Sequence, residues 1–112
     1  MITTHVLDTS RGRPAAGLAV RLERYHEGGQ TEVLGWGTTD VDGRVRSILP
    51  PGSGLTQGPH RLVFETGTYF AETGVTGFFP EVVITFEVRD ASQHHHVPLL
   101  LSPYGYSTYR GS

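Results

Sequence analysis

Alternation of apolar and polar residues with a period of two restricts the fold of this chain more than any other feature. It is clearest over residues 82–88 and recurs over residues 18–25, whereas helical periodicity is almost absent. A period of two places successive side chains on opposite faces of a strand, so these segments predict half-buried β-strands. The strands that we predict cover residues 2–9, 18–25, 36–39, 44–48, 61–65, 82–88 and 94–101.

Turn-forming residues separate the predicted strands. The dipeptide Gly28-Gly29 predicts one hairpin, and Asp42-Gly43 predicts another, between residues 36–39 and 44–48. Only residues 67–73 look helical. Short strands joined by turns within 112 residues predict a single all-β sandwich domain spanning residues 1–112.

Composition excludes several classes of protein. A net charge of −2 predicts no nucleic-acid partner, and the absence of cysteine excludes a disulfide framework and a thiolate metal site. The first residues lack a signal-peptide pattern, and no apolar run approaches the length of a membrane span. We therefore expect a cytoplasmic protein with no membrane partner.

Large aromatic side chains are usually buried in the core of a domain. The aromatic residues expected in the core are Trp36, Phe64, Tyr69 and Phe86.

Six histidines are present, and His94, His95 and His96 are consecutive. Imidazole is a common zinc ligand, but adjacent strand residues point to opposite faces, so His95 cannot join the other two. Neighbours on one face of a strand are also usually too far apart to chelate one ion unaided. We expect no metal site and no cofactor.

The same face argument places two histidines on the outside of the sandwich. Residues 97, 99 and 101 form a predicted core face, which leaves His96 on the opposite side. His5 likewise lies opposite the apolar Ile2 and Val6. Either these two histidines share a site on the outer side of one sheet, or they are idle surface residues.

Arg44 directly follows the Asp42-Gly43 turn. It is either a solvated surface arginine or a clamp for an anion or carbonyl, because guanidinium presents a planar fork of donors. A cation near an imidazole would lower its pKa and keep it neutral and able to accept a proton near pH 7.

Three segments are similar to a known family. They are Thr-His-Val-Leu-Asp-Thr at residues 4–9 with Gly-Arg-Pro-Ala at 12–15, Thr-Asp-Val-Asp-Gly-Arg at 39–44, and the long run from His96 to Ser112. Over essentially its whole length the chain resembles the 5-hydroxyisourate hydrolases, the enzymatic relatives of transthyretin.

The resemblance implies a fold and an assembly. The implied fold is a transthyretin-like sandwich of two four-stranded sheets with one short helix, in which His5, Arg44, His96 and residues 109–112 belong to one sheet. The implied assembly is a homotetramer, a dimer of dimers, in which these sheets enclose a channel. Residues of neighbouring subunits would line each active site.

The resemblance also implies an activity on a small molecule. The implied reaction is hydrolysis of 5-hydroxyisourate, the product of urate oxidation, at a ring C–N bond to 2-oxo-4-hydroxy-4-carboxy-5-ureidoimidazoline. The residues implied as catalytic are His5, Arg44, His96 and Ser112. The residues implied to bind substrate and close the pocket are Tyr109, Arg110 and Gly111.

Roles within this set are hypotheses. His5 would orient or deprotonate the attacking water, Arg44 would stabilise the oxyanion, and His96 would bind or protonate the substrate. His95 stands where the family commonly has tyrosine, and since it lies on the face opposite His96 we expect catalysis to survive. The chain also lacks a peroxisomal terminal tripeptide, in keeping with a cytoplasmic enzyme.

The main alternative is a non-enzymatic, transthyretin-type carrier that binds a small aromatic ligand in the tetramer channel. Fold alone does not separate the two functions. Carriers lack the combination of His5, Arg44 and His96, and this chain has all three, which favours the hydrolase.

Overall fold

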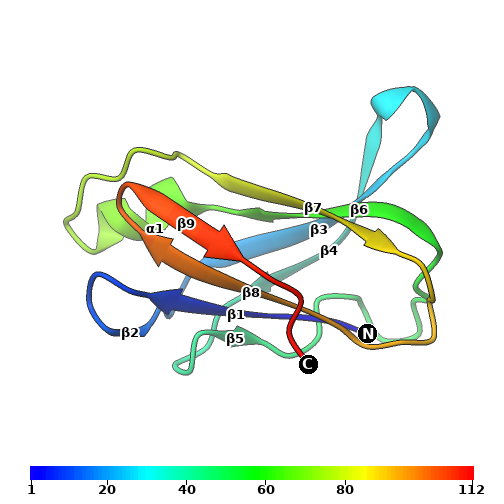
Figure 1. Ribbon diagram of the computed structural model, residues 1–112, viewed down its shortest axis with the longest axis horizontal. Helices are drawn as coiled ribbons and strands as arrows, with labels where there is room; N and C mark the ends of the chain where they lie inside the picture. Colours follow the sequence, from blue (N-terminus) through cyan, green and yellow to red (C-terminus); the bar gives the residue numbers. More distant parts are fainter.

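The computed structural model describes residues 1–112 and shows two β-sheets packed face to face, with one short helix at one end (Figure 1). What we term the β1 sheet contains β1 (Ile2–Asp8), β2 (Arg13–Pro14), β5 (Arg44–Val45), β8 (His95–Ser102) and β9 (Gly105–Thr108). What we term the β3 sheet contains β3 (Ala19–Tyr25), β4 (Thr31–Thr38), β6 (Gly58–Phe64) and β7 (Val82–Val88). The helices are the short 3-10 turn η1 (Glu27–Gly29) and α1 (Thr66–Glu72).

The β1 sheet contains five strands in four positions. β1 runs parallel to β8, and β8 pairs antiparallel with β9. On its other edge, β1 pairs with β2 through Leu7 and Asp8 and with β5 through Thr4 and His5. The two short strands thus follow one another along the same edge. The β3 sheet is antiparallel throughout, in the order β4-β3-β6-β7. The predicted all-β sandwich with one short helix is confirmed.

The core lies between the sheets and contains the inward side chains that the alternation predicts. In β1 the buried positions are every second residue, from Ile2 to Asp8. The buried Asp8 carboxylate accepts hydrogen bonds from the backbone and hydroxyl of Ser10 and from the hydroxyl of Tyr69, at 2.8 Å. This last bond ties α1 to β1, and a buried carboxylate with its oxygens satisfied avoids most of its desolvation cost.

The two predicted hairpins had different outcomes. Gly28-Gly29 does join the paired strands β3 and β4, through η1. The prediction at Asp42-Gly43 is wrong: the turn forms, with the Gly43 N–H donating to the Asp40 carbonyl at 2.9 Å, but β4 and β5 belong to different sheets. Turn residues determine a local reversal of the chain, whereas the partner of the next strand is determined by distant residues. Here the chain crosses from one sheet to the other.

Trp36 is a second correction, because it lies outside the core and is 60 % exposed. The inward positions of β4 are instead Gly35 and Gly37, where an added Cβ would collide with the Ile48 carbonyl and the Val45 side chain. The close approach of this neighbouring segment leaves no room for side chains. The alternation of the strand therefore directs Trp36 outward, while Phe64 and Tyr69 are buried as expected and Phe86 packs against the core.

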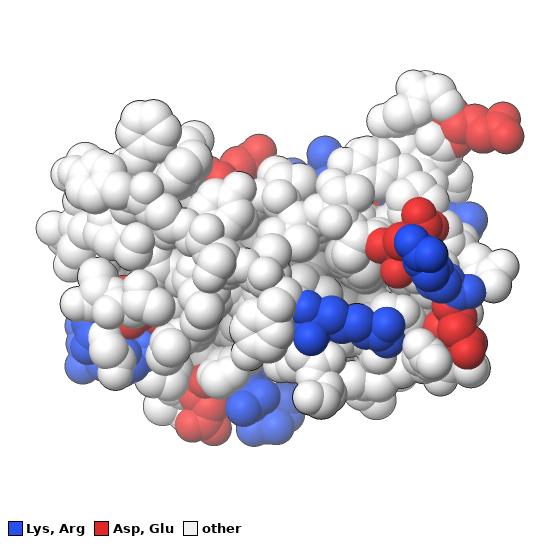
Figure 2. Space-filling view, viewed as in Figure 1, with Lys and Arg blue, Asp and Glu red and all other residues white.

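Charged residues are dispersed over the surface. On the face in Figure 2, arginine side chains are interspersed with Asp and Glu, and no field of one sign covers that face. The single α-helix has seven residues, and no helix is both long enough and apolar enough to cross a bilayer.

Candidate active site

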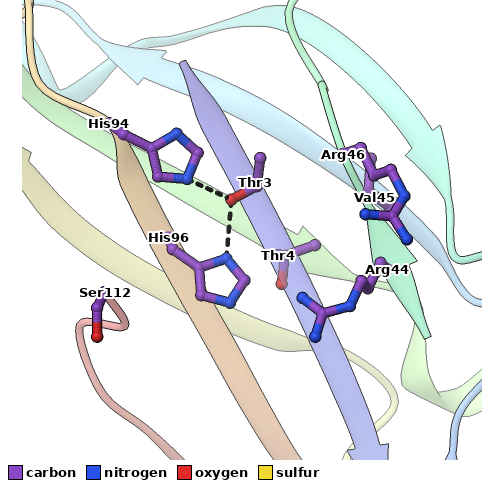
Figure 3. A pocket seen from close by; sticks show the side chains of 8 residues that line it. All are labelled: Thr3, Thr4, Arg44, Val45, Arg46, His94, His96 and Ser112. Atoms are coloured by element: carbon purple, nitrogen blue, oxygen red, sulfur yellow. Dashed lines mark hydrogen bonds between the residues drawn. The ribbon is translucent and has the colours of Figure 1, made fainter. Parts of the chain in front are cut away.

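A polar pocket of about 250 Å³ lies on the outer face of the β1 sheet, beside the C-terminus (Figure 3). Its walls come from β1, β5, the start of β8 and the end of the chain. The residues that line it are Thr3, Thr4, Arg44, Val45, Arg46, His94, His96 and Ser112.

Strand register brings the predicted histidines and arginine to one face. His5 on β1 is directly opposite Arg44 on β5, and Thr3 on β1 is directly opposite His96 on β8. Thr3 and His5 are two residues apart and therefore share a face. The expectation that His5 and His96 lie on the outer side of one sheet is confirmed, with His96 in the pocket wall and His5 beside it.

Arg44 directly follows the Asp42-Gly43 turn, and its backbone N–H donates to the Asp40 carboxylate at 3.0 Å. Its guanidinium takes part in none of the ion pairs of the structure, whereas Arg46 lies 3.8 Å from the carboxylates of both Asp40 and Asp42. Arg44 is therefore a cation without a protein counter-ion in a small polar pocket, an arrangement suited to a negatively charged or carbonyl-bearing ligand.

His96 is held in its neutral form. Burial lowers the pKa of the His96 imidazole below its usual value, and the positive charge of Arg44 lowers it further, with smaller contributions from His94 and His5. A neutral imidazole at pH 7 retains one nitrogen that accepts a proton and one that donates.

One hydroxyl connects two of the histidines. The Thr3 Oγ1 lies 2.8 Å from His96 Nδ1 and 3.0 Å from His94 Nε2, and both contacts are drawn in Figure 3. The two rings are nearly parallel, with centroids 6.3 Å apart. Sequence reasoning missed Thr3, because its place beside His96 depends on the parallel register of two strands that are far apart in the chain.

The end of the chain lies against His96. The Gly111 N–H donates to the His96 carbonyl at 2.8 Å, and a Cβ on Gly111 would collide with the His96 ring. Glycine at this position allows the backbone to cross the imidazole, which places Ser112 at the pocket.

The other two predicted C-terminal residues are not in this pocket. Tyr109 and Arg110 line a second hollow of about 330 Å³ near β7, which His96 also lines, and Arg110 donates to the carbonyl of His94 at 3.3 Å. The structure thus brings together His5, Arg44, His96 and the terminal Gly111 and Ser112, and it places Tyr109 and Arg110 in a neighbouring hollow that shares His96. The roles of all these residues remain predictions.

His95 points away from the pocket, as the face argument predicts. It is 5 % exposed, and its Nδ1 has no hydrogen-bond partner. No group of three or more His, Cys, Asp or Glu side chains is arranged to hold a metal ion.

The groups in the pocket suit hydrolysis of a carbonyl compound. A guanidinium with free donors can stabilise developing oxyanion charge, and the neutral His96 imidazole can exchange protons with water or a leaving group at neutral pH.

Comparison with known proteins identifies the family of the chain. The family model described as HIUase/Transthyretin family matches residues 2–111. The chain is 50 % identical over 115 residues to the 5-hydroxyisourate hydrolase 2 of Rhizobium meliloti, covering 99 % of this chain and 95 % of that protein. The structure of Klebsiella pneumoniae 5-hydroxyisourate hydrolase superimposes with a TM-score of 0.85 at 40 % identity, covering 99 % of this chain and 98 % of the other. Sea bream transthyretin in complex with thyroxine superimposes with a TM-score of 0.90 at 25 % identity, covering 98 % of this chain and 93 % of the other. On its sequence, its fold and its full-length match, the chain belongs to the HIUase/Transthyretin family.

Proposed function

We propose that this protein hydrolyses 5-hydroxyisourate to 2-oxo-4-hydroxy-4-carboxy-5-ureidoimidazoline, a step of urate degradation. The observation that carries the proposal is the pocket in which Arg44, without a counter-ion, faces a neutral His96 beside His5. The full-length likeness to proteins named 5-hydroxyisourate hydrolase supports the same substrate.

Each residue has a chemical task in this proposal. His5 takes a proton from the attacking water, whose oxygen bonds to a ring carbonyl carbon, and Arg44 stabilises the resulting oxyanion. The C–N bond then breaks, and His96 gives a proton to the departing nitrogen. Ser112 lines the same pocket and contacts the water or substrate.

The carrier alternative is less well supported. The fold similarity to transthyretin, with a TM-score of 0.90, is as high as that to the hydrolase, so fold does not discriminate between them. Sequence identity does favour the hydrolase, at 40 % against 25 %. A carrier site for an aromatic ligand is also expected to be mainly apolar, whereas Val45 is the one hydrophobic residue lining this pocket.

The proposal includes the homotetramer. β7 pairs only with β6 and β9 only with β8, so each sheet has an open edge there. Residues of β7 and β9 line one hollow, so the two edges lie on the same side of the sandwich. Open edges favour pairing with a second copy, and packing of two β1 sheets would then enclose the pockets. Sedimentation velocity would distinguish a tetramer from a dimer or monomer. Cytoplasmic location stays a prediction, to be checked by cell fractionation.

The activity test generates 5-hydroxyisourate in place from urate with urate oxidase and follows its ultraviolet decay. The wild-type protein should accelerate the decay, and His96→Ala should lose that acceleration while keeping its circular dichroism spectrum. Unaccelerated decay with folded wild-type protein would contradict the hydrolase and favour the carrier.

A further inference from the structure

The Thr3 hydroxyl has one proton but two imidazole partners. It lies within hydrogen-bond distance of His96 Nδ1 and of His94 Nε2. A hydroxyl donates one hydrogen bond and accepts others, so Thr3 donates to one ring and accepts from the other. The protonation of the two rings is therefore linked through this one atom.

Only two neutral arrangements satisfy both hydrogen bonds. In one, Thr3 donates to His96 Nδ1 and accepts from His94 Nε2–H, so both rings carry their proton on Nε2. In the other, His96 Nδ1–H donates to Thr3 and Thr3 donates to His94 Nε2, so both rings carry it on Nδ1. Movement of one proton from His94 Nε2 to Thr3 and of one from Thr3 to His96 Nδ1, with loss of a proton at His96 Nε2 and uptake of one at His94 Nδ1, converts the first arrangement into the second.

The two nitrogens of His96 face different surroundings. Nδ1 is directed at Thr3, and Nε2 lies on the side of the pocket toward Arg44 (Figure 3). His94 is at the exposed end of this chain of hydrogen bonds, where it exchanges protons with bulk water. The geometry thus connects the reacting end of His96 to solvent through Thr3 and His94.

We propose that Thr3 and His94 are positioning residues that hold His96 with its Nε2–H toward the substrate and supply a proton to its Nδ1 during each turnover. This inference rests on the proposed hydrolase function. Thr3 and His94 act through His96 and do not need to touch the substrate.

The proton transfers balance. As the C–N bond breaks, His96 Nε2 gives its proton to the departing nitrogen, and Thr3 gives its hydroxyl proton to His96 Nδ1. Thr3 takes the Nε2 proton of the neutral His94 ring, and His94 takes up a proton from water at its Nδ1. His96 and Thr3 end with unchanged charge, so His96 never becomes an imidazolate. The same transfers in reverse, with loss of a proton from His94 Nδ1 to water and uptake of one from water at His96 Nε2, restore the first arrangement before the next turnover.

Other charged groups face His96 from each neighbouring element. These are Arg44 on β5 and His5 on β1, together with His94 just before β8. The cation Arg44 disfavours a doubly protonated His96, so delivery of a proton to Nδ1 as another leaves Nε2 avoids that state.

The test compares Thr3→Val, which keeps the β-branched shape but removes the hydroxyl, with Thr3→Ser, which keeps the hydroxyl. Thr38→Val is the matched control, because Thr38 is an exposed strand residue on the β3 sheet. His94→Phe keeps a ring without nitrogens, and the double variant Thr3→Val/His94→Phe completes a cycle. For each, kcat, KM and the pH dependence of kcat are measured, with thermal unfolding as a check of folding.

We expect Thr3→Val to lower kcat roughly 10- to 100-fold with KM within about twofold, and to change the shape of the pH–kcat profile. Thr3→Ser should restore kcat to within about threefold, and Thr38→Val should behave as wild type. The double variant should be no slower than the slower single variant, because both changes interrupt one relay.

Nitrogen-15 spectra of the histidine rings give a readout independent of turnover. In the wild type, one pH titration should move the His94 and His96 signals together, and in Thr3→Val they should move separately. Unchanged kcat and pH profile in folded Thr3→Val, or fully additive losses in the cycle, would overturn the relay. The hydrolase function would stand in that case if wild type is active and His96→Ala is not, whereas inactive wild type would overturn both.

Discussion

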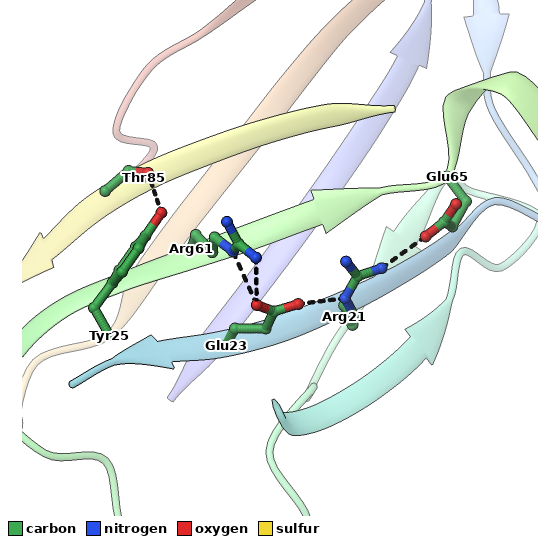
Figure 4. Close-up of polar contacts among 6 residues, drawn as sticks. All are labelled: Arg21, Glu23, Tyr25, Arg61, Glu65 and Thr85. Atoms are coloured by element: carbon green, nitrogen blue, oxygen red, sulfur yellow. Dashed lines mark hydrogen bonds and ion pairs between the residues drawn. The ribbon is translucent and has the colours of Figure 1, made fainter. Parts of the chain in front are cut away.

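The outer faces of the two sheets both carry arginines, but the arginines are paired with carboxylates on one sheet and Arg44 is unpaired on the other. On the β3 sheet, Arg21 and Arg61 both bond to the carboxylate of Glu23 (Figure 4). On the β1 sheet, Arg44 has no carboxylate partner and acts on the pKa of His96 instead. Charges that neutralise one another stabilise a sheet surface, whereas a cation without a counter-ion remains available to a ligand.

The β3 network is satisfied almost completely within the protein. Glu23 is 3 % exposed, and Arg61 bonds to it at 2.8 and 2.9 Å. Burial raises the pKa of the Glu23 carboxyl, but the hydrogen bonds from Arg21 and Arg61 outweigh burial and hold that pKa below its usual value. The Arg21 guanidinium lies 5.7 Å from the centroid of the Trp36 ring, which gives the exposed tryptophan a favourable cation–π contact.

The largest effect on activity is expected from a substitution on the outer face of the β1 sheet, compared with a matched substitution next to the β3 sheet. His5→Gln should lower kcat roughly 1,000-fold, because it removes the group assigned to activate water, with the melting temperature nearly unchanged. His26→Gln is the matched control, since His26 is an exposed histidine paired with Glu32 next to the β3 sheet. It should retain full activity in the ultraviolet decay assay. Equal activity of His5→Gln and His26→Gln would remove His5 from the mechanism.

Arg44→Gln should lower kcat/KM roughly 100-fold, about 3 kcal/mol of transition-state stabilisation. Because the Arg44 cation lowers the pKa of His96, its removal raises that pKa. The acid limb of the pH–rate profile should therefore move to higher pH. Arg61→Gln on the β3 sheet should lower stability and leave both kcat/KM and the pH–rate profile as in wild type. A similar loss of kcat/KM in both variants would contradict a specific role of Arg44 in catalysis.

Glu23→Gln tests the structural side of the comparison. It should lower the free energy of unfolding by about 2 kcal/mol, less than for a fully buried pair because the arginines are partly exposed, and leave kcat unchanged. Since the native pKa of Glu23 is lowered, its stabilisation is present above pH 4.5 and is lost as pH falls through the native value. Urea unfolding at pH 7 and pH 3 would measure both. A loss of kcat in a stable Glu23→Gln protein would contradict a purely structural role for Glu23 and show that the β3 sheet also affects catalysis.

The smallest effect concerns the pH dependence of stability. Burial lowers the pKa of His60 in the β3 sheet and of His95 and His96 in the β1 sheet. The unfolded chain binds protons below pH 6.5 while the native histidines resist them, so stability should decline as pH falls from 6.5 toward the native values. Each histidine contributes at most about 1.4 kcal/mol per pH unit.

His60→Leu measures how much of the pH dependence of the free energy of unfolding comes from the β3 sheet and how much from the β1 sheet. His60 is fully buried with an unpartnered Nε2, and its removal should reduce the slope by the share of one histidine. Urea midpoints between pH 5 and pH 7 would show this. An unaltered slope would assign all of the pH dependence to the β1 sheet.

Errors in the sequence prediction had physical causes. Residue type predicts Trp36 in the core, although the alternation of its own strand, with Gly35 and Gly37 inward, directs it outward. The Asp42-Gly43 dipeptide predicts the turn correctly, but β5 pairs with β1, in the other sheet. Residue type alone misplaced Trp36, whereas a strand distant in sequence decided the partner of β5.

The sequence by itself determined the longer strands except the first part of β4, and it placed His5 and His96 on an outward face, because a period of two is a property of each strand alone. The short strands β2 and β9 were not among the strands it predicted. The tertiary structure alone decided that Thr3 lies opposite His96, that Arg44 lies opposite His5, and that Tyr109 and Arg110 line a neighbouring hollow and not the pocket itself. Backbone hydrogen-bonding groups are the same at every residue, so a strand does not specify which distant strand it will pair with or in which register. Packing of the whole sandwich selects that pairing, and with it the active site.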